Sequence, residues 1–271
     1  MSKRETIGVT GDAGFIGTAF TAEISGELMY VGMDKHWGKS QDIREYRNLQ
    51  EEFLPLESVD DPVVVHLAAE ASVDADWPQA FKNNCVGTLN VAEYCREHDA
   101  RLINVSSVAA RHPHTSAYAM SKWIQEVIVS RYDIDSTTIR LPNVVGPGHR
   151  KGNVRHMIRE GVNEGVVRVW YDGEGLRSYV SAETVATTLH AVARGDVTVE
   201  NDLTHIDGAD LTTREVGEIV ADELREVRDE EIPVVDVDNE AASPKELTVT
   251  GGIGSPTIAE ERIREQVRTY E

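Results

Sequence analysis

The chain has 271 residues, 40% of them hydrophobic, which allows one large α/β domain or a nucleotide-binding domain with a small second lobe. Acidic residues outnumber basic ones by 47 to 27, and the resulting net charge of −20 disfavours nucleic acid and anionic membranes as partners. No apolar run reaches the roughly 18 residues of a membrane span, and the first residues lack a secretory signal pattern, so we expect a cytoplasmic protein. The dispersed acidity favours adaptation to a salty cytoplasm, as in a halophile, with an ordinary acidic mesophilic protein as the alternative.

Strand and helix patterns alternate through the first half of the chain. Strands are expected at 6–10, 28–33, 62–67, 101–105 and 137–141, and helices at 14–24, 43–53, 77–97 and 117–131. This β-α-β alternation predicts an α/β fold of the Rossmann type, a doubly wound parallel sheet with helices on both faces.

The pattern changes after Pro147. Helices are expected at 153–164, 182–193 and 213–227, and strands at 166–171 and 204–206, with a turn at 172–175. We therefore expect a dinucleotide-binding domain at 1–147 and a small C-terminal α/β substrate lobe at 148–271. The lobe is expected to be interleaved with the first domain and not to fold alone. The acidic tail beyond Pro233 carries no clear pattern.

Three glycines, Gly11, Gly14 and Gly17, follow the first strand and open the first helix. A pyrophosphate fits the positive end of such a helix when glycine lets the backbone approach. Asp34 follows the second strand, where a carboxylate accepts both ribose hydroxyls and repels a 2′-phosphate, which favours NAD over NADP. The neighbouring Lys35 and His36 offset part of that repulsion. The alternative is a glycine-rich turn that binds nothing.

A second constellation combines Tyr118 and Lys122, one helical turn apart, with Ser106 and Ser107 at a strand end. A lysine ammonium beside a phenol favours the phenolate and lowers the tyrosine pKa, so that Tyr118 can exchange a proton with a sugar hydroxyl. The serine hydroxyl can hold the reacting oxygen. The alternative is a surface pair on an amphipathic helix.

The sequence at this point resembles the extended short-chain dehydrogenase/reductase family, the NAD-dependent epimerase/dehydratase group. The similar segments are T-G-x-x-G-F-I-G at 10–17, Asp42-Ile43, H-L-A-A at 66–69, N-x-x-G-T at 84–88, N-V-x-G-P at 143–147 and G-D-G-x-x-R-D-F at 173–180. The resemblance implies catalytic roles for Ser107, Tyr118 and Lys122, and substrate contacts for Asn143 and Arg177. It implies cofactor contacts, beyond those glycines and Asp34, for Phe15, Ile16, Asp42, Ile43, Leu67, Ala68, Ala69, Asn84, Tyr118 and Lys122.

The sequence also departs from the family's pattern. Ser107 and Tyr118 are only eleven residues apart, so the segment that usually shapes the substrate pocket is short. Its His112 and His114 are interpreted as exposed loop residues, with substrate contact as the alternative. Val108 and Ala109 replace the Asp-Glu pair of the 4,6-dehydratases, which excludes that reaction. Residues 71–74 are similar to dTDP-4-dehydrorhamnose reductases, although the S-T-D-Y-V-F signature of those enzymes is absent.

The leading hypothesis is an NAD-dependent oxidoreductase or epimerase acting on a hydroxyl of a nucleotide-linked sugar. The alternatives are a dehydrogenase of a free aldose or uronate, a dTDP-4-dehydrorhamnose reductase-like enzyme, and a non-catalytic NAD(H)-binding regulator. We predict no metal site. Family habit further implies a homodimer or higher homo-oligomer, in which the helices at 77–97 and 117–131 pack as a four-helix bundle.

Overall fold

The computed structural model describes residues 6–25, 29–34, 42–72, 75–199, 202–237, 244–249, 251–254 and 259–270. The chain forms two compact units, each with a hydrophobic core of its own. The first unit comprises Met1–Leu141 and Val185–His205, and the second Pro142–Thr184 and Ile206–Glu271.

A parallel six-stranded sheet forms the centre of the first unit. Its described strands are β1 (Thr6–Thr10), β2 (Met29–Met33), β3 (Val63–His66), β4 (Arg101–Ser107), β5 (Ser136–Leu141) and β9 (Leu203–His205). They run in the order β2-β1-β3-β4-β5-β9, and every neighbouring pair is parallel. The predicted Rossmann-type fold is therefore confirmed.

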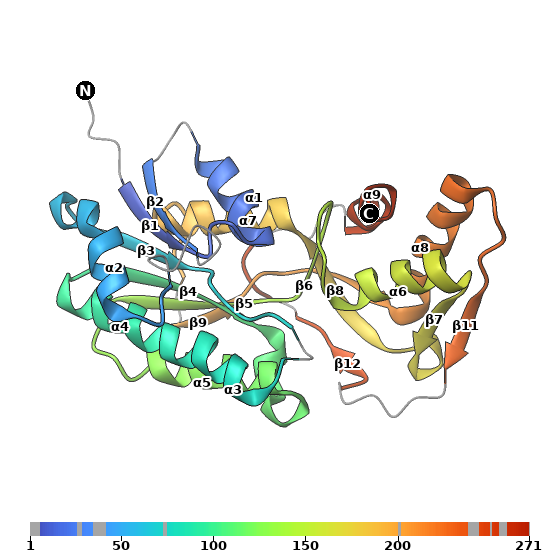
Figure 1. Cartoon of the computed structure of the whole chain (residues 1–271), viewed down its shortest axis with the longest axis horizontal. Coiled ribbons are helices and arrows are strands. Elements are labelled where there is room, and N and C mark those ends of the chain that lie inside the picture. Colours follow the sequence, from blue (N-terminus) through green and yellow to red (C-terminus); the bar gives the residue numbers. More distant parts are fainter. Residues whose placement is uncertain are drawn as a thin grey trace. The chain divides into compact units, whose positions relative to one another are not determined.

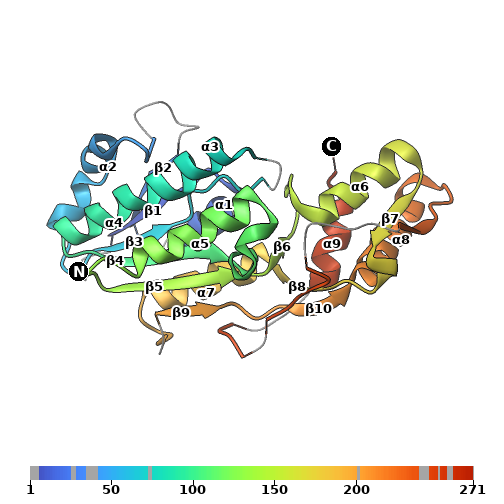
Figure 2. The same cartoon turned by 90° about the horizontal axis from the view of Figure 1, so that it is seen from below.

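Helices cover both faces of this sheet (Figures 1 and 2). One face carries α1 (Phe15–Ile24) and α7 (Ala182–Ala193), and the other carries α3 (Trp77–Ala80), α4 (Gly87–Glu97) and α5 (Ala117–Val129). The short α2 (Tyr46–Glu52) packs against α4. The strand order reverses at β1, which lies between β2 and β3, and open α/β sheets bind ligands beyond the carboxyl ends of the strands at such a point.

The predicted single helix over 77–97 is interrupted by a π-helical turn at Phe81–Val86, between α3 and α4. The wider turn lets two successive side chains, Asn84 and Cys85, be buried together. Directly after it, Gly87 lies so close to Ile43 that an added Cβ would be 2.5 Å from the Ile43 Cδ1 atom. Periodicity does not reveal this turn because the buried Asn84 is polar.

The second unit is built on strand β8 (Leu176–Ser181), which pairs with β10, β12 and β6. A separate two-stranded sheet joins β7 and β11, and three helices pack together around the core (Figure 1). The remaining elements are β6 (Asn143–Val145), α6 (Gly152–Glu164), β7 (Val167–Trp170), β10 (Ala209–Thr212), α8 (Thr213–Arg228), β11 (Val234–Val237), β12 (Glu246–Leu247) and α9 (Ala259–Arg268). Of these, the sequence pattern predicts only α6, β7 and α8.

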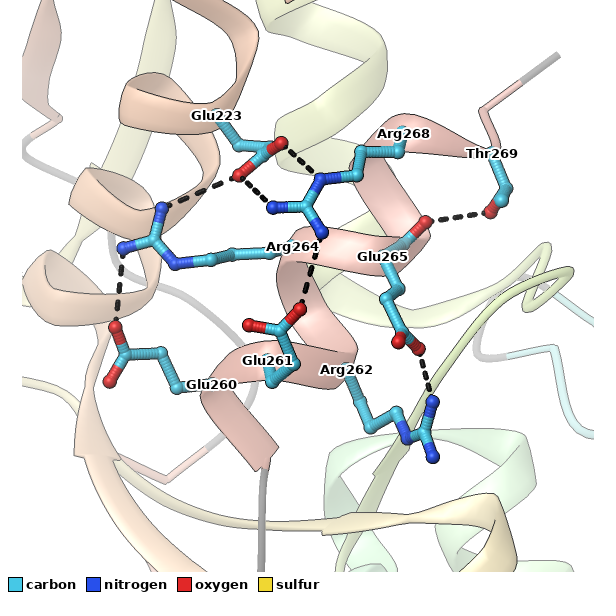
Figure 3. A network of polar contacts seen from close by, with 8 residues as sticks. All are labelled: Glu223, Glu260, Glu261, Arg262, Arg264, Glu265, Arg268 and Thr269. Carbon is cyan, nitrogen blue, oxygen red and sulfur yellow. Dashed lines mark hydrogen bonds and ion pairs between the residues drawn. The ribbon is translucent and has the colours of Figure 1, made fainter. Parts of the chain in front are cut away.

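The unassigned tail ends in α9, which ion pairs hold against α8 (Figure 3). The carboxylate of Glu223 in α8 is 2% exposed and accepts hydrogen bonds from Arg268 at 2.6 and 3.1 Å. Arg264 contacts the same carboxylate at 3.5 Å and pairs with Glu260 within α9. The buried apolar side of α9 is Ala259, Ile263 and Val267, the helical spacing of an amphipathic helix.

Candidate active site

The glycine loop lies where β1 ends and α1 begins. Gly11 has φ +77°, and an added Cβ there would lie 2.6 Å from the backbone nitrogen of Ala68. A Cβ on Gly17 would lie 2.0 Å from the carbonyl oxygen of Gly11. Gly14 caps α1 without a side-chain hydrogen bond, and no acidic residue lies in the first turn, where Phe15 and Ile16 are half-buried. This cradle fits the pyrophosphate of a dinucleotide, because its backbone is closely packed and the helix end keeps its positive dipole.

The segment that follows β3, with Leu67, Ala68 and Ala69, lies against the glycine loop and is fixed there by His66. The imidazole bridges Thr10 Oγ1 at 2.6 Å and Thr88 Oγ1 at 2.9 Å. Thr88 already donates its hydroxyl proton to the carbonyl of Asn84, so it accepts from Nε2 of His66. Burial, and next the charge of Lys122, lower the pKa of His66 to about 3, which keeps this bridging ring neutral.

Asp34, the predicted ribose ligand, directly follows β2 and is half-buried. Lys35 and His36, whose charges bear on its preference for NAD, lie outside the described residues. The carboxylate of Asp42 accepts two hydrogen bonds from Arg44 Nε at 2.8 and 2.9 Å. The carbonyl of Ile43 accepts a 2.8 Å bond from Asn90 in α4, so that helix positions Asp42 and Ile43, the predicted cofactor-contacting pair.

Asn84 is fully buried, and its amide makes hydrogen bonds within the protein. Its Oδ1 accepts from the backbone nitrogen of Glu70 at 2.7 Å, and its Nδ2 donates to the carbonyl of Glu70 at 3.0 Å. Nδ2 also donates to Ser121 Oγ at 2.8 Å. Asn84 thus joins the loop after β3 to helix α5, which carries Tyr118 and Lys122.

The predicted serine, tyrosine and lysine lie together at the end of β4 and the start of α5. The two serines differ in their partners: Ser106 donates to Glu126 at 2.6 Å, whereas the Ser107 hydroxyl accepts from the backbone nitrogen of Ala109 at 3.2 Å and so caps the next turn. Ser116 caps α5 by accepting from the backbone nitrogen of Ala119 at 3.0 Å, so the helix starts at Ala117, one residue before Tyr118.

The ionisation of this group differs from the sequence-based expectation. Burial raises the pKa of Tyr118 above its usual value, and the hydrogen bond with Ser107 lowers it in part. The Lys122 ammonium donates instead to the carbonyl of Val105 at 2.9 Å and to Gln125 Oε1 at 2.8 Å. Burial lowers the pKa of Lys122 to about 8, opposed by the charge of Glu126.

Two short 3₁₀ turns, Val108–Arg111 and Pro113–Thr115, form most of the segment between Ser107 and Tyr118. His112 is half-buried between them and His114 is exposed, with their ring centroids 6.4 Å apart. Their assignment as loop residues stays a prediction.

The predicted substrate residues, Asn143 and Arg177, belong to the second unit. Asn143 is half-buried in β6 and donates to the carbonyl of Ser178 at 3.1 Å. Arg177, in β8, is 8% exposed and donates to the carbonyls of Leu176, Pro244 and Lys245. Each therefore already has a structural role within its own sheet.

Sequence reasoning missed the polar side chains beneath α5. Glu126 pairs with Arg140 through bonds of 2.8 and 2.7 Å, and Gln125 lies next to Lys122. Helical spacing offered a signal, since positions 125 and 126 follow Lys122 by three and four residues. Their sheet partners Asn104 and Thr138 lie in strands, where no helical spacing links them to Lys122, and so carry no such signal.

A glycine-rich turn follows β1, where the strand order reverses. A serine lies at the end of β4, and a tyrosine and a lysine lie in the helix that follows. This combination defines a dinucleotide-dependent enzyme of the extended short-chain dehydrogenase/reductase type. The chain belongs to the NAD dependent epimerase/dehydratase family, whose pattern it matches over residues 7–203. NAD is the cofactor of this family, which confirms the predicted cofactor.

Solved structures of similar fold cover nearly the whole chain. UDP-glucose 4-epimerase of Thermus thermophilus, in complex with NAD, superposes with a TM-score of 0.79 at 22% identity, covering 97% of this chain and 98% of that one. WbmG of Bordetella bronchiseptica, with NAD and UDP, gives 0.80 at 16% identity and covers 99% and 95%. The dTDP-4-dehydrorhamnose reductase of Bacillus anthracis, with NADP, gives 0.77 at 18% identity and 98% of both chains.

A curated relative at higher identity matches only a part of the chain. Ceramide reductase of Caulobacter vibrioides is 38% identical over 87 residues, which are 32% of this chain and 27% of that protein. The match thus spans about a quarter of the relative's length. Among the described residues, no helix is long and apolar enough to cross a membrane.

Proposed function

We propose that this enzyme oxidises or epimerises a hydroxyl-bearing carbon of a nucleotide-linked sugar. The observation that carries the proposal is the placement of three residues: Ser107 ends β4, Tyr118 lies in the first turn of α5, and the buried Lys122 follows one helical turn later. A substrate hydroxyl beside the Ser107 and Tyr118 oxygens meets a proton carrier and a hydrogen-bonding partner at once.

Each residue of the group has a separate task. Ser107 orients the substrate oxygen, and Tyr118 takes its proton or returns it. In this proposal the Lys122 ammonium, one helical turn from Tyr118, favours the phenolate, whereas burial raises the pKa of that phenol. When bound, NAD accepts a hydride from the sugar carbon or returns one. Gly11, Gly14 and Gly17 would hold its pyrophosphate and Asp34 a ribose, with the other predicted contacts around them.

Support for a nucleotide-linked sugar comes from the predicted roles of Asn143 and Arg177. Two structures of similar fold, WbmG with UDP and MoeE5 with UDP-glucose, are in line with it. The short interval between Ser107 and Tyr118, only two 3₁₀ turns, favours the second candidate, an NAD-dependent dehydrogenase of a free aldose or uronate. Reduction in the manner of a dTDP-4-dehydrorhamnose reductase is a third outcome. The presence of both Tyr118 and Lys122 argues against a non-catalytic NAD(H)-binding regulator.

A screen for NADH formation with free, UDP-linked and dTDP-linked sugars separates these reactions. Interconversion of a nucleotide sugar without net NADH supports an epimerase, whereas stoichiometric NADH from a free sugar supports the second candidate. Tyr118→Phe is expected to lower kcat by roughly 100-fold or more while NADH still binds. The matched control is Tyr132→Phe, a tyrosine elsewhere in the same unit. Unchanged turnover in Tyr118→Phe would contradict the proposed role.

We also propose that the enzyme is a homodimer joined through the α3 to α5 face. This face exposes several large apolar side chains of the first unit: Trp77, Phe81, Leu89, Trp123 and Val127. Apolar residues gathered on neighbouring helices are typical of an interface. Trp123→Glu is expected to give monomers by light scattering. Val227→Glu, which changes an exposed side chain of α8 outside this face, is expected to keep the dimer. A wild-type monomer would exclude the proposal.

A further inference from the structure

Helix α5 contacts the central sheet through polar side chains. Asn104 and Ser106 alternate along β4 and therefore face the same side of the sheet. The parallel register places them beside Thr138 and Arg140 of β5. Asn104 is fully buried, and Ser106 and Thr138 are 3% and 5% exposed, at positions where a helix usually meets a sheet through apolar side chains. Burying polar groups at such an interface costs free energy unless each of them is hydrogen-bonded. The partners of these side chains therefore need to be identified one by one.

The polar groups form two separate sets. In the first, Glu126 accepts from Ser106 and from Arg140, which satisfies the carboxylate inside the fold. In the second, a directed chain of hydrogen bonds starts at Lys122: Nζ donates to Gln125 Oε1 at 2.8 Å, and Gln125 Nε2 donates to Asn104 Oδ1 at 2.6 Å. Asn104 Nδ2 then donates to Thr138 Oγ1 at 3.1 Å.

The direction of this chain is fixed by Lys122. An ammonium has only donors, so Gln125 must turn its oxygen towards it and its NH₂ towards Asn104. The same argument then orients Asn104. Both amide dipoles therefore present their negative ends towards Lys122, which stabilises its positive charge.

Few other groups near Lys122 can supply this stabilisation. Glu126, on the same helix, raises the pKa of Lys122 but is already paired with Arg140. From the π-helical turn, Cys85 has a pKa raised by burial to about 11, so its thiol is neutral at pH 7. From β3, His66 is neutral as well. The direct acceptors of the buried ammonium are the carbonyl of Val105 and the Gln125 side chain.

We propose that Gln125, held by Asn104, is a positioning residue that fixes the Lys122 ammonium beside Tyr118 and keeps it charged. The catalytic meaning of this role rests on the proposed function, because it supposes that Lys122 acts on Tyr118. The effect on Lys122 itself is independent of any substrate and can be measured on the protein alone.

The direct test is a pH titration of the lysine ¹³Cε resonances in protein labelled with ¹³C-lysine. The chain has only seven lysines, and Lys122→Arg identifies the resonance of interest. Gln125→Leu is expected to lower the titration midpoint of Lys122 by about one pH unit, since one hydrogen bond to the charged form is lost. Gln125→Glu, of nearly equal shape, is expected to raise the midpoint.

The matched control is Val129→Ala, a buried apolar position on the same helix, which weakens the packing of α5 without touching the polar chain. Its Lys122 midpoint is expected to equal that of the wild type. If Gln125→Leu does not fold, the rise in Gln125→Glu decides the matter. A Lys122 midpoint unchanged in Gln125→Glu, or a shift of equal size in Val129→Ala, would overturn the proposal.

Turnover supplies a second readout. In Gln125→Leu the alkaline limb of the kcat profile is expected to move to lower pH by the shift seen for the Lys122 resonance, with little change in the KM for the sugar. The Lys122 titration midpoints could shift as expected although the protein turns over none of the sugars tested. Gln125 would then still be the residue that holds Lys122. In that case the proposed function fails and the inference on Gln125 stands.

Discussion

Arg177 in β8 donates a 2.6 Å hydrogen bond to the carbonyl of Lys245, a residue 68 positions later in the chain. The same guanidinium donates to the carbonyl of Pro244. The backbone nitrogen of Leu176 donates to the carbonyl of Lys245 at 3.0 Å. The arginine for which the family resemblance implies a substrate contact therefore also ties the segment with β12 to the sheet of the second unit.

Replacing Arg177 tests both roles. Arg177→Gln is expected to lower the free energy of unfolding by about 2 kcal/mol, because buried carbonyls lose a charged donor. Amide exchange at Leu176 is expected to accelerate. A substrate role adds a rise in the KM for the nucleotide-linked sugar. Arg228→Gln, an arginine paired with Glu230 on the surface of the same unit, is expected to change none of these. Equal effects of the two variants would refute the structural role.

Lys122 gives the protein a distinctive dependence of stability on pH. Its folded pKa of about 8 lies below the reference value of 10.5, so between these values the unfolded chain binds more protons and stability rises with pH. Lys122→Met lacks this titration. The wild type is therefore expected to gain up to about 3 kcal/mol relative to Lys122→Met as the pH rises from 8 to 10.5. Urea denaturation at several pH values measures the difference, and a constant difference would contradict the burial of a charged lysine.

How much of the candidate site could be predicted depends on how local its signals are. Gly11 and Gly17 are recognisable because close backbone contacts leave no room for a Cβ, a constraint that a short motif records. Tyr118 and Lys122 share one helix, so their spacing already predicts their common face. Their ionisation was not predictable, since it depends on Gln125 and on Val105, whose contacts with Lys122 are set by how α5 packs on β4.

The elements of the fold also divide into those with a local sequence signal and those that depend on tertiary pairing. Strands of the parallel sheet were predicted from runs such as the three valines of β3 and from their alternation with helices, whereas β6, β10 and β12 are two to four residues long. Elements so short lack a measurable period, and their pairing with β8 arises only in the folded unit. Helix α9 was not predicted, because its few apolar residues lie among Glu and Arg residues that form ion pairs in the folded unit.

The neutral bridge at His66 is expected to make the first unit sensitive to acid. The folded-state pKa of about 3 lies below the reference value of 6.5, so the unfolded chain gains a proton first as the pH falls through 6.5. His66→Leu loses the bridge to Thr10 and Thr88 and is expected to be less stable by about 2 kcal/mol at pH 7. That deficit should shrink between pH 6.5 and 4, as thermal unfolding of both proteins will show. A deficit independent of pH would contradict the neutral ring.

The buried carboxylate of Glu223 is expected to anchor α9. Glu223→Gln leaves Arg264 and Arg268 without their shared partner, which is expected to cost about 2 kcal/mol, given that both guanidinium groups are partly exposed. Glu164→Gln, which removes only a surface pair, is the control. Chemical denaturation compares the two. A loss confined to α9 should appear first in amide exchange of its backbone, and similar losses in both variants would exclude the anchoring role.

The net charge of −20 predicts that salt stabilises the protein. The Debye length falls from about 10 Å at 0.1 M to about 3 Å at 1 M salt, which screens repulsion among surface carboxylates. The melting temperature is expected to rise by several degrees between 0.1 and 2 M KCl. Sucrose at matched osmolality controls for preferential exclusion. An equal rise in sucrose, or no rise in KCl, would count against adaptation to a salty cytoplasm.

The π-helical turn at Phe81–Val86 has a consequence for how this chain tolerates insertions and deletions. Such a turn holds one residue more than an α-helical turn, so deleting one residue there leaves a continuous helix. The flanking helices α3 and α4 would keep nearly the same phase, because the π turn absorbs its extra residue within one turn. The deletion would instead end the joint burial of Asn84 and Cys85, and with it the hydrogen bond from Asn84 to Ser121. The extra residue is therefore retained for the side chains it buries rather than for the length of the helix.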